Sequence, residues 1–131
     1  EFENLNYIEF RNRYIPNSEL VSLIKDSLFV VCPYIDATQS GVIMTSYAFC
    51  KPVIASNIGG LSEVVVDKVT GYLIESNNIV ELQNSIIKLV SNKKLLDTMK
   101  QNVFDYFHQG QGGWNKISDD LFEVYTKMQH K

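Results

Sequence analysis

The 131-residue sequence predicts a three-layer α/β fold, in which a parallel sheet lies between helices and further helices follow at the C-terminal end. Two short β-branched runs, at residues 28–32 and 53–55, suit buried parallel strands, and the segment at 41–49 between them suits a helix. Polar and glycine residues gather where each strand ends and the next helix begins. Beyond residue 77, apolar residues recur at helical spacing, which predicts an all-helical end.

The first half of the chain alternates between strands and helices. Residues 6–11 alternate polar and apolar side chains and predict a first strand, and a helix capped by Asn17 or Ser18 should follow it. A short helix or turn is expected at 61–66 and a last strand at 72–75. The resulting β-α-β-α-β-α-β order predicts a thin sheet of four parallel strands with right-handed crossovers.

The second half is typical of consecutive helices. Asn78 and Glu81 have the spacing of a capping box, and the apolar residues after them follow a helical period. Asn92 should begin another helix, which the glycines at 110–113 end, and residues 114–128 should form a third. We therefore predict one truncated domain over residues 1–131, with a β/α sheet portion at 1–77 and C-terminal helices at 78–131.

Composition and charge are those of an ordinary globular chain. The net charge of −3 provides no basic surface for nucleic acid or anionic lipid. Cys32 and Cys50 lie in apolar surroundings, which favours reduced core cysteines over a disulfide or a metal pair. No signal peptide and no apolar run long enough to span a membrane is present. We therefore expect a cytoplasmic chain without a transmembrane segment, with peripheral attachment of the intact protein to the inner membrane face as an alternative.

Residues with chemical potential concentrate in the loop after the first buried run. In parallel α/β sheets, ligands bind outside the carboxyl ends of the strands, where this loop should lie. A helix N-terminus offers free N–H groups and the positive end of the helix dipole, which suit a phosphate group. The residues at this place are Asp36, Thr38, Gln39, Ser40 and Gly41, joined by Gly59 and Gly60 in the turn after the next strand.

Simpler structural roles remain open for the same residues. Ser40 would serve as a helix cap without any ligand, and Asp36 as a turn residue. Gly59 and Gly60 would serve chain reversal alone. Glu63 lies in the first turn of the next helix, and the dipole of that helix explains a carboxylate there almost as well as a functional role does.

The run PYIDATQSGVIMTSYAFCKPVIASNIGGLSEVVVDKVTGYLI resembles the donor-binding core of the C-terminal domain of group 1 (family 4) glycosyltransferases. These are retaining enzymes built from two Rossmann-like domains, the GT-B architecture. The ATQSGVI form is similar to a subset common among bacterial surface-polysaccharide enzymes. The resemblance covers nearly the whole chain and implies a Rossmann-like, partial GT-B C-terminal domain.

The resemblance implies a fragment of an enzyme that transfers a sugar from a nucleotide-sugar donor to an acceptor hydroxyl with retention, in polysaccharide or lipopolysaccharide synthesis. No metal ion or other cofactor is implied. The loop residues Thr38–Gly41 would face the diphosphate, and Gly59 and Gly60 the nucleotide or sugar. Of the two glutamates common in the family, the ribose-binding one falls on Thr45, and the sugar-binding one falls next to Asp36, a candidate donor-sugar contact.

The resemblance also places essential parts upstream of residue 1. These are the basic residues that neutralise the diphosphate and an N-terminal acceptor-binding domain, so we expect the isolated chain to be inactive. A truncated sheet edge further predicts self-association. Two alternatives stay open: a fragment of a GT-B nucleotide-sugar epimerase, although no histidine lies near the loop, and a non-enzymatic flavodoxin-like interaction domain.

Overall fold

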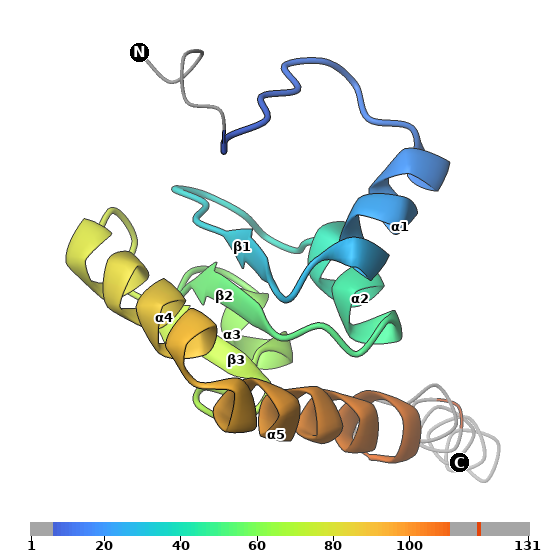
Figure 1. Ribbon diagram of the computed structural model, residues 1–131, viewed down its shortest axis with the longest axis vertical. Helices are drawn as coiled ribbons and strands as arrows, with labels where there is room; N and C mark the ends of the chain where they lie inside the picture. The colour runs from blue at the N-terminus through green and yellow to red at the C-terminus, as the bar shows by residue number, and fades with distance from the viewer. Residues whose placement is uncertain (1–6, 111–117, 119–131) are drawn as a thin grey trace, which may run out of the picture.

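A computed structural model describes residues 7–110 and Ser118, and at its centre is a parallel sheet (Figure 1). The strands are β1 (Val30–Cys32), β2 (Val53–Ser56) and β3 (Gly71–Ile74), in the spatial order β1-β2-β3. Val53 pairs with Val30 on one side and with Gly71 on the other. A Cβ atom on Gly71 would lie 1.8 Å from the carbonyl oxygen of Val53, so only glycine fits this position.

The helices connect the strands and then follow one another. α1 (Asn17–Asp26) precedes β1, α2 (Gly41–Ala48) connects β1 to β2, and α3 (Leu61–Val64) connects β2 to β3. α4 (Ile79–Ser91) and α5 (Lys93–Phe104) follow, and a π-helical turn, η1 (Asp105–Gln109), continues α5. This order confirms the predicted α/β class. Apart from Ser118, the helix predicted at 114–128 lies outside the described residues.

Alternate residues of β2 point to opposite faces of the sheet and build two cores. Val53 and Ala55 pack against α2, α3 and the end of α5, while Ile54 packs against α4 and α5. Tyr47 of α2 is fully buried in the first core, where its hydroxyl shares a 2.5 Å hydrogen bond with the Thr70 hydroxyl. The sheet is therefore covered on both faces, and its carboxyl edge is left for the loops.

The predicted starts of α4 and α5 are confirmed by their capping bonds. The Asn78 side chain accepts from the Glu81 N–H at 3.0 Å, and the Asn92 side chain accepts from the Leu95 N–H at 3.0 Å. The carboxylate of Glu81 accepts from the Glu75 N–H at 2.8 Å, instead of from Asn78 as in a standard capping box. Both helices thus begin where local side-chain chemistry predicts.

The strand predicted at residues 6–11 is wrong over its described part, because residues 7–16 form an irregular N-terminal arm. Tyr7 and Phe10 remain 82% and 68% exposed, so the alternating pattern buries no apolar face. The described sheet provides no neighbouring strand with which this segment pairs. The described sheet therefore has three strands instead of the expected four.

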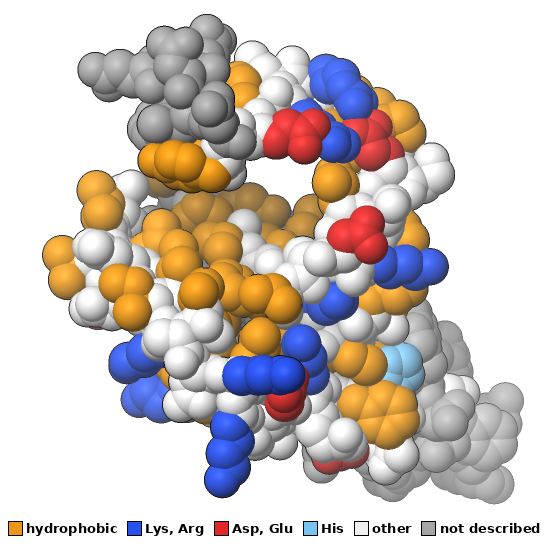
Figure 2. Space-filling view, viewed as in Figure 1, with side chains coloured by type: hydrophobic (Ala, Val, Ile, Leu, Met, Phe, Trp, Pro, Cys, Tyr) orange, Lys and Arg blue, Asp and Glu red, His pale blue; other side chains and the backbone are white. Residues whose placement is uncertain are grey.

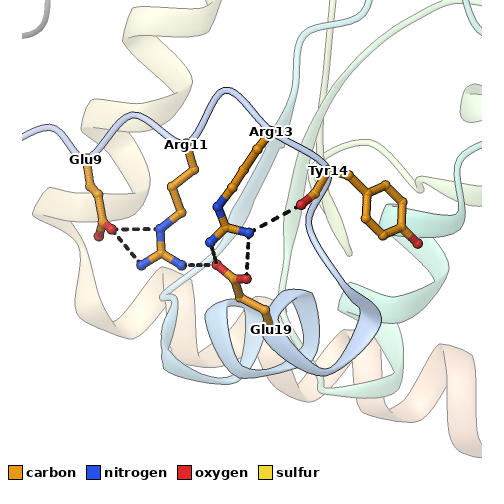
Figure 3. Close-up of polar contacts among 5 residues, drawn as sticks. All are labelled: Glu9, Arg11, Arg13, Tyr14 and Glu19. Atoms are coloured by element: carbon orange, nitrogen blue, oxygen red, sulfur yellow. Dashed lines mark hydrogen bonds and ion pairs between the residues drawn. The ribbon is translucent and has the colours of Figure 1, made fainter.

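The predicted caps of α1 are also wrong, because Pro16 occupies the N-cap position and no side chain makes a cap hydrogen bond there. The arm is instead tied to the helix by ion pairs (Figure 3). The Glu19 carboxylate lies 2.6 Å from an Arg13 nitrogen and 2.5 Å from an Arg11 nitrogen. The Arg13 hydrogen bond, followed by that of Arg11, holds the pKa of Glu19 below its ordinary value.

Apolar side chains are exposed on the outer surface of α4 and over the centre of the molecule (Figure 2). We call the exposed apolar surface of α4, formed by Ile79, Val80, Ile87 and Val90, the α4 face. A shallow hollow of about 370 Å³ lies along it, lined by Ile79, Leu82, Gln83, Ile86 and Ile87. Among the described residues, no helix combines the length and apolarity needed to cross a membrane.

Candidate functional site

The loop after β1 leads into α2, and Ser40 fixes the point at which the helix begins. The Ser40 hydroxyl accepts from the Ile43 N–H at 3.4 Å, which confirms its role as a helix cap. The Tyr34 hydroxyl lies 3.4 Å from the same oxygen and holds the loop against the helix end. The space next to Gly41 is open, because a Cβ atom there would meet no heavy atom within 4 Å. The cap uses the Ile43 N–H, whereas the N–H groups of Gly41 and Val42 have no partner within the helix, and Gly41 is exposed.

The turn after β2 is fastened to this loop through backbone contacts. The Gly60 N–H donates to the Thr38 carbonyl oxygen at 3.0 Å. A Cβ atom on Gly59 would lie 2.0 Å from the Ala37 carbonyl oxygen, and one on Gly60 would lie 2.6 Å from the Thr38 carbonyl oxygen. Gly59 also has a φ of +48°, which disfavours any side chain. The close approach that these glycines permit is thus between two loops of the protein itself.

Two hollows adjoin at the N-terminus of α2. The loop pocket, of about 400 Å³, is lined by Tyr34, Asp36, Ala37, Thr38, Gln39, Ser40, Gly41 and Val42. The interhelix pocket, of about 300 Å³, is lined by Gln39, Ser40, Gly41, Ile43, Met44, Gly60, Leu61, Glu63 and Val64. Both hollows share Gln39, Ser40 and Gly41, so one ligand can reach both across the helix end.

The structure brings most of the sequence-predicted residues together. Thr38, Gln39, Ser40 and Gly41 line one continuous surface, and Asp36 is exposed in the loop pocket. Thr45 is apart from them: its hydroxyl donates to the Gly41 carbonyl oxygen at 2.8 Å, and it lines neither pocket.

Two residues of the site were not singled out from the sequence. Tyr34 contacts the capping serine, and its only sequence signal is an aromatic residue just beyond a strand end. Met44 lies one turn into α2 and forms a wall of the interhelix pocket. Its apolar type suggested a buried helix face instead, although 37% of it is exposed.

The ionisable groups beneath the loop are neutral near neutral pH. Burial raises the pKa of the Cys32 thiol, and the neighbouring Tyr34 and Ser40 hydroxyls act in the opposite direction. Burial likewise raises the pKa of the Tyr34 hydroxyl. No lysine, arginine or histidine lines either pocket within the described part of the chain. An anion at this place would therefore depend on N–H groups and hydroxyls, with no cationic side chain from the described residues.

Over residues 7–110, no group of three or more histidine, cysteine, aspartate or glutamate side chains is arranged to hold a metal ion. The polar residues that line the two pockets carry hydroxyls, amides and two separate carboxylates, those of Asp36 and Glu63. This donor set suits a ligand that carries both phosphate and hydroxyl groups.

A parallel sheet covered by helices on both faces, with adjoining pockets at a helix N-terminus on its carboxyl edge, defines a Rossmann-like domain. The sequence pattern of the family described as "Glycosyl transferases group 1" matches residues 7–105. The chain therefore belongs to the group 1 glycosyltransferases.

Relatives and a solved structure agree with this assignment. An uncharacterized glycosyltransferase of Methanocaldococcus jannaschii is 31% identical over 125 residues, which cover 95% of this chain and 35% of the relative. A D-inositol 3-phosphate glycosyltransferase of Thermobifida fusca is 25% identical over 116 residues, covering 88% of this chain and 26% of the relative. The crystal structure of the C-terminal domain of a group 1 glycosyl transferase from Francisella tularensis matches with a TM-score of 0.64 at 26% identity, over 75% of this chain and 49% of that one.

The chain corresponds to only part of its relatives. It spans about a third or less of the length of the curated relatives that it matches. The GT-B C-terminal-like fold and the family are thus established for this segment. The epimerase and interaction-domain alternatives receive no support from the matches.

Proposed function

We propose that this chain is the donor-binding part of a glycosyltransferase that transfers a sugar from a nucleotide-sugar donor to an acceptor hydroxyl with retention of configuration. The observation that carries this proposal is the meeting of two pockets at the open N-terminus of α2. Family membership supplies the reaction class. The ATQSGVI loop supports, by resemblance alone, a role in bacterial surface-polysaccharide synthesis.

The chemistry at the helix end favours a diphosphate leaving group. As the bond to the sugar breaks, negative charge develops on the diphosphate, and the N–H groups of α2 stabilise that charge. The Thr38 and Ser40 hydroxyls and the Gln39 amide border the same space. Asp36, which also lines the loop pocket, repels phosphate and accepts from hydroxyls, so we assign it to the donor sugar.

We also propose that the isolated chain is inactive and needs no metal ion to bind its ligand. The two pockets provide no cation among the described residues, so basic groups would come from outside those residues. The acceptor site would come from the rest of a longer protein, since the chain spans 35% of the relative from Methanocaldococcus jannaschii. A few charge-assisted hydrogen bonds, each of about 1.5–3 kcal/mol, are largely offset by the cost of ordering the ligand. We expect UDP or GDP to bind with a Kd of about 1 mM, or about −4 kcal/mol.

Ligand-observed NMR with pyrophosphate, UDP and GDP tests the proposal on the 131-residue chain. Gly41→Pro removes the first helical N–H, and proline is favoured at this helix position. Ser40, at φ −139° and ψ 112°, already has the extended backbone that precedes a proline. Gly41→Ala is the matched control, because it keeps the N–H and its methyl group enters open space.

We expect Gly41→Pro to weaken binding of all three ligands, and Gly41→Ala to leave binding near that of the unmodified chain. Equal binding by both variants would show that the helix end is not the phosphate site. Absence of any binding signal at a ligand concentration of about ten times the expected Kd would rule out the proposed site. Micromolar binding would show that basic groups from elsewhere are unnecessary.

A further inference from the structure

We propose that Glu63 binds a pair of hydroxyl groups on the sugar portion of the ligand, an assignment that rests on the proposed function. Glu63 lies in the first turn of α3 and lines the interhelix pocket. The other residues that line this pocket are Gln39, Ser40, Gly41, Ile43, Met44, Gly60, Leu61 and Val64, so Glu63 is its one charged side chain among the described residues. Glu63 is exposed, so a carboxylate that borders this hollow is accessible to hydrogen-bond donors of a ligand.

The Glu63 carboxylate has no structural task in the described part of the chain. The other glutamates differ in this respect: Glu19 is held by two arginines, and Glu81 accepts from the Glu75 N–H. Glu63 makes no ion pair or side-chain hydrogen bond within residues 7–110. Since α3 has only four residues, its dipole also offers the carboxylate little stabilisation.

The position of Glu63 is fixed relative to the proposed phosphate site. Gly60, three residues before it, donates to the Thr38 carbonyl oxygen at 3.0 Å, and no Cβ atom fits between these two backbones. The turn that carries Glu63 therefore cannot move away from the loop that ends at Gly41. A diphosphate held at the helix end carries a group on each side, and the interhelix pocket, which shares Gln39, Ser40 and Gly41 with the loop pocket, is within reach of one of them.

The charge of Glu63 determines which group that is. A carboxylate repels phosphate, accepts hydrogen bonds and donates none, and its two oxygens match two neighbouring hydroxyls. Met44, Leu61 and Val64 supply an apolar wall for the C–H face of a sugar ring. The shared chemistry is a vicinal diol, which comes either from the ribose of the nucleotide or from the transferred sugar.

The test compares ligands that differ by one group at a time. The 131-residue chain and its Glu63→Gln variant are titrated by NMR with pyrophosphate, UDP or GDP, the matching 2′,3′-dideoxynucleoside diphosphate, and UDP-glucose or GDP-mannose. Asp97→Asn is the control: it removes one negative charge at a surface pair with Lys100, on α5. The fold of each variant is checked by its ¹H–¹⁵N spectrum.

We expect Glu63→Gln to leave pyrophosphate binding unchanged or slightly stronger and to weaken diol-bearing ligands about tenfold, while Asp97→Asn changes none of them. If the ribose supplies the diol, the unmodified chain binds the ribonucleotide more tightly than its dideoxy form, and Glu63→Gln abolishes the difference. If the transferred sugar supplies the diol, the unmodified chain binds the nucleotide sugar more tightly than the nucleoside diphosphate, and Glu63→Gln abolishes this difference in affinity. Identical profiles for Glu63→Gln and the unmodified chain overturn this inference but leave the phosphate site standing, whereas absent pyrophosphate and nucleotide binding overturns the proposed function itself.

Discussion

Replacing Gly59 by alanine tests whether the two loops of the site are locked together by their backbones. Gly59 has a φ of +48°, a conformation that costs an L-amino acid about 1–2 kcal/mol. The new Cβ atom would also lie 2.0 Å from the Ala37 carbonyl oxygen, so the loops have to separate. Their separation breaks the 3.0 Å hydrogen bond from the Gly60 N–H to Thr38.

The contributions add to a measurable loss of stability. The broken hydrogen bond contributes about 0.5–1.5 kcal/mol beyond the backbone strain, so we expect Gly59→Ala to lower the free energy of unfolding by about 2–3 kcal/mol. This is a large share of the roughly 5–15 kcal/mol that a domain typically has. With a urea m-value of about 1.5 kcal/mol per molar, the unfolding midpoint should fall by about 1.3–2 M.

Gly41→Ala is the matched comparison, because it changes glycine to alanine in the same site without strain. Its methyl group would meet no heavy atom within 4 Å, and it lies in the first turn of α2. We expect a gain of up to about 0.5–1 kcal/mol, from reduced freedom of the unfolded chain. If Gly59→Ala changes stability by less than about 0.5 kcal/mol, or if the two variants behave alike, the loops are not locked as described.

Three further outcomes follow from other contacts. Burial raises the pKa of Tyr47 to about 12, above its unfolded value of about 10, so stability should be intact below about pH 10 and fall as pH rises towards 12. Tyr47→Phe should remove that fall at a cost of about 1 kcal/mol at neutral pH, as read from urea midpoints. Lys51→Met should cost about 1–2 kcal/mol in the same assay, because the Lys51 ammonium donates at 2.7 Å to the carbonyl oxygens of Lys25 and Ser27 at the end of α1. The chain should also self-associate through β1 and the α4 face in light scattering, and Ile87→Lys should reduce the association.

Each of these outcomes has a control or a contrary result. An unchanged alkaline profile in Tyr47→Phe would assign the pH dependence to other tyrosines. Lys100→Met removes a lysine from an exposed 3.7 Å surface pair, and a loss as large as that of Lys51→Met would argue against the helix-end contact. A clean monomer at high protein concentration would contradict association through these surfaces.

The elements set by local chemistry were predictable from the sequence. The β-branched runs predict β1 and β2 within about two residues, and Asn78 and Asn92 predict the starts of α4 and α5 because a cap needs only its own turn. The prediction of a strand at residues 6–11 failed because alternating side chains form a strand only where a neighbouring strand supplies hydrogen bonds. The predicted cap of α1 was wrong because Pro16 occupies the cap position, although Asn17 and Ser18 are residue types that commonly cap helices.

The site was predictable in place but not in its contacts. A parallel sheet brings the ends of β1 and β2 to one edge, so the loop before α2 and the turn at Gly59 had to be neighbours. The sequence does not show what approaches a glycine, and here the approaching groups are the Ala37 and Thr38 carbonyls. It also left Glu63 between two interpretations, because only the folded chain shows that this residue lines a pocket and that its carboxylate is unpaired over residues 7–110.

The distribution of charge separates ligand orientation from ligand affinity. The described walls of the two pockets carry Asp36 on one side of the α2 N-terminus and Glu63 on the other, with no cation between them. A helix end contributes only about half a positive charge, less than a diphosphate needs for tight binding. On the proposed function, the carboxylates would disfavour phosphate at both flanks and leave it one favourable place, at Gly41. We infer that this chain fixes how the donor lies, and that cations from outside the described residues determine how tightly it is held.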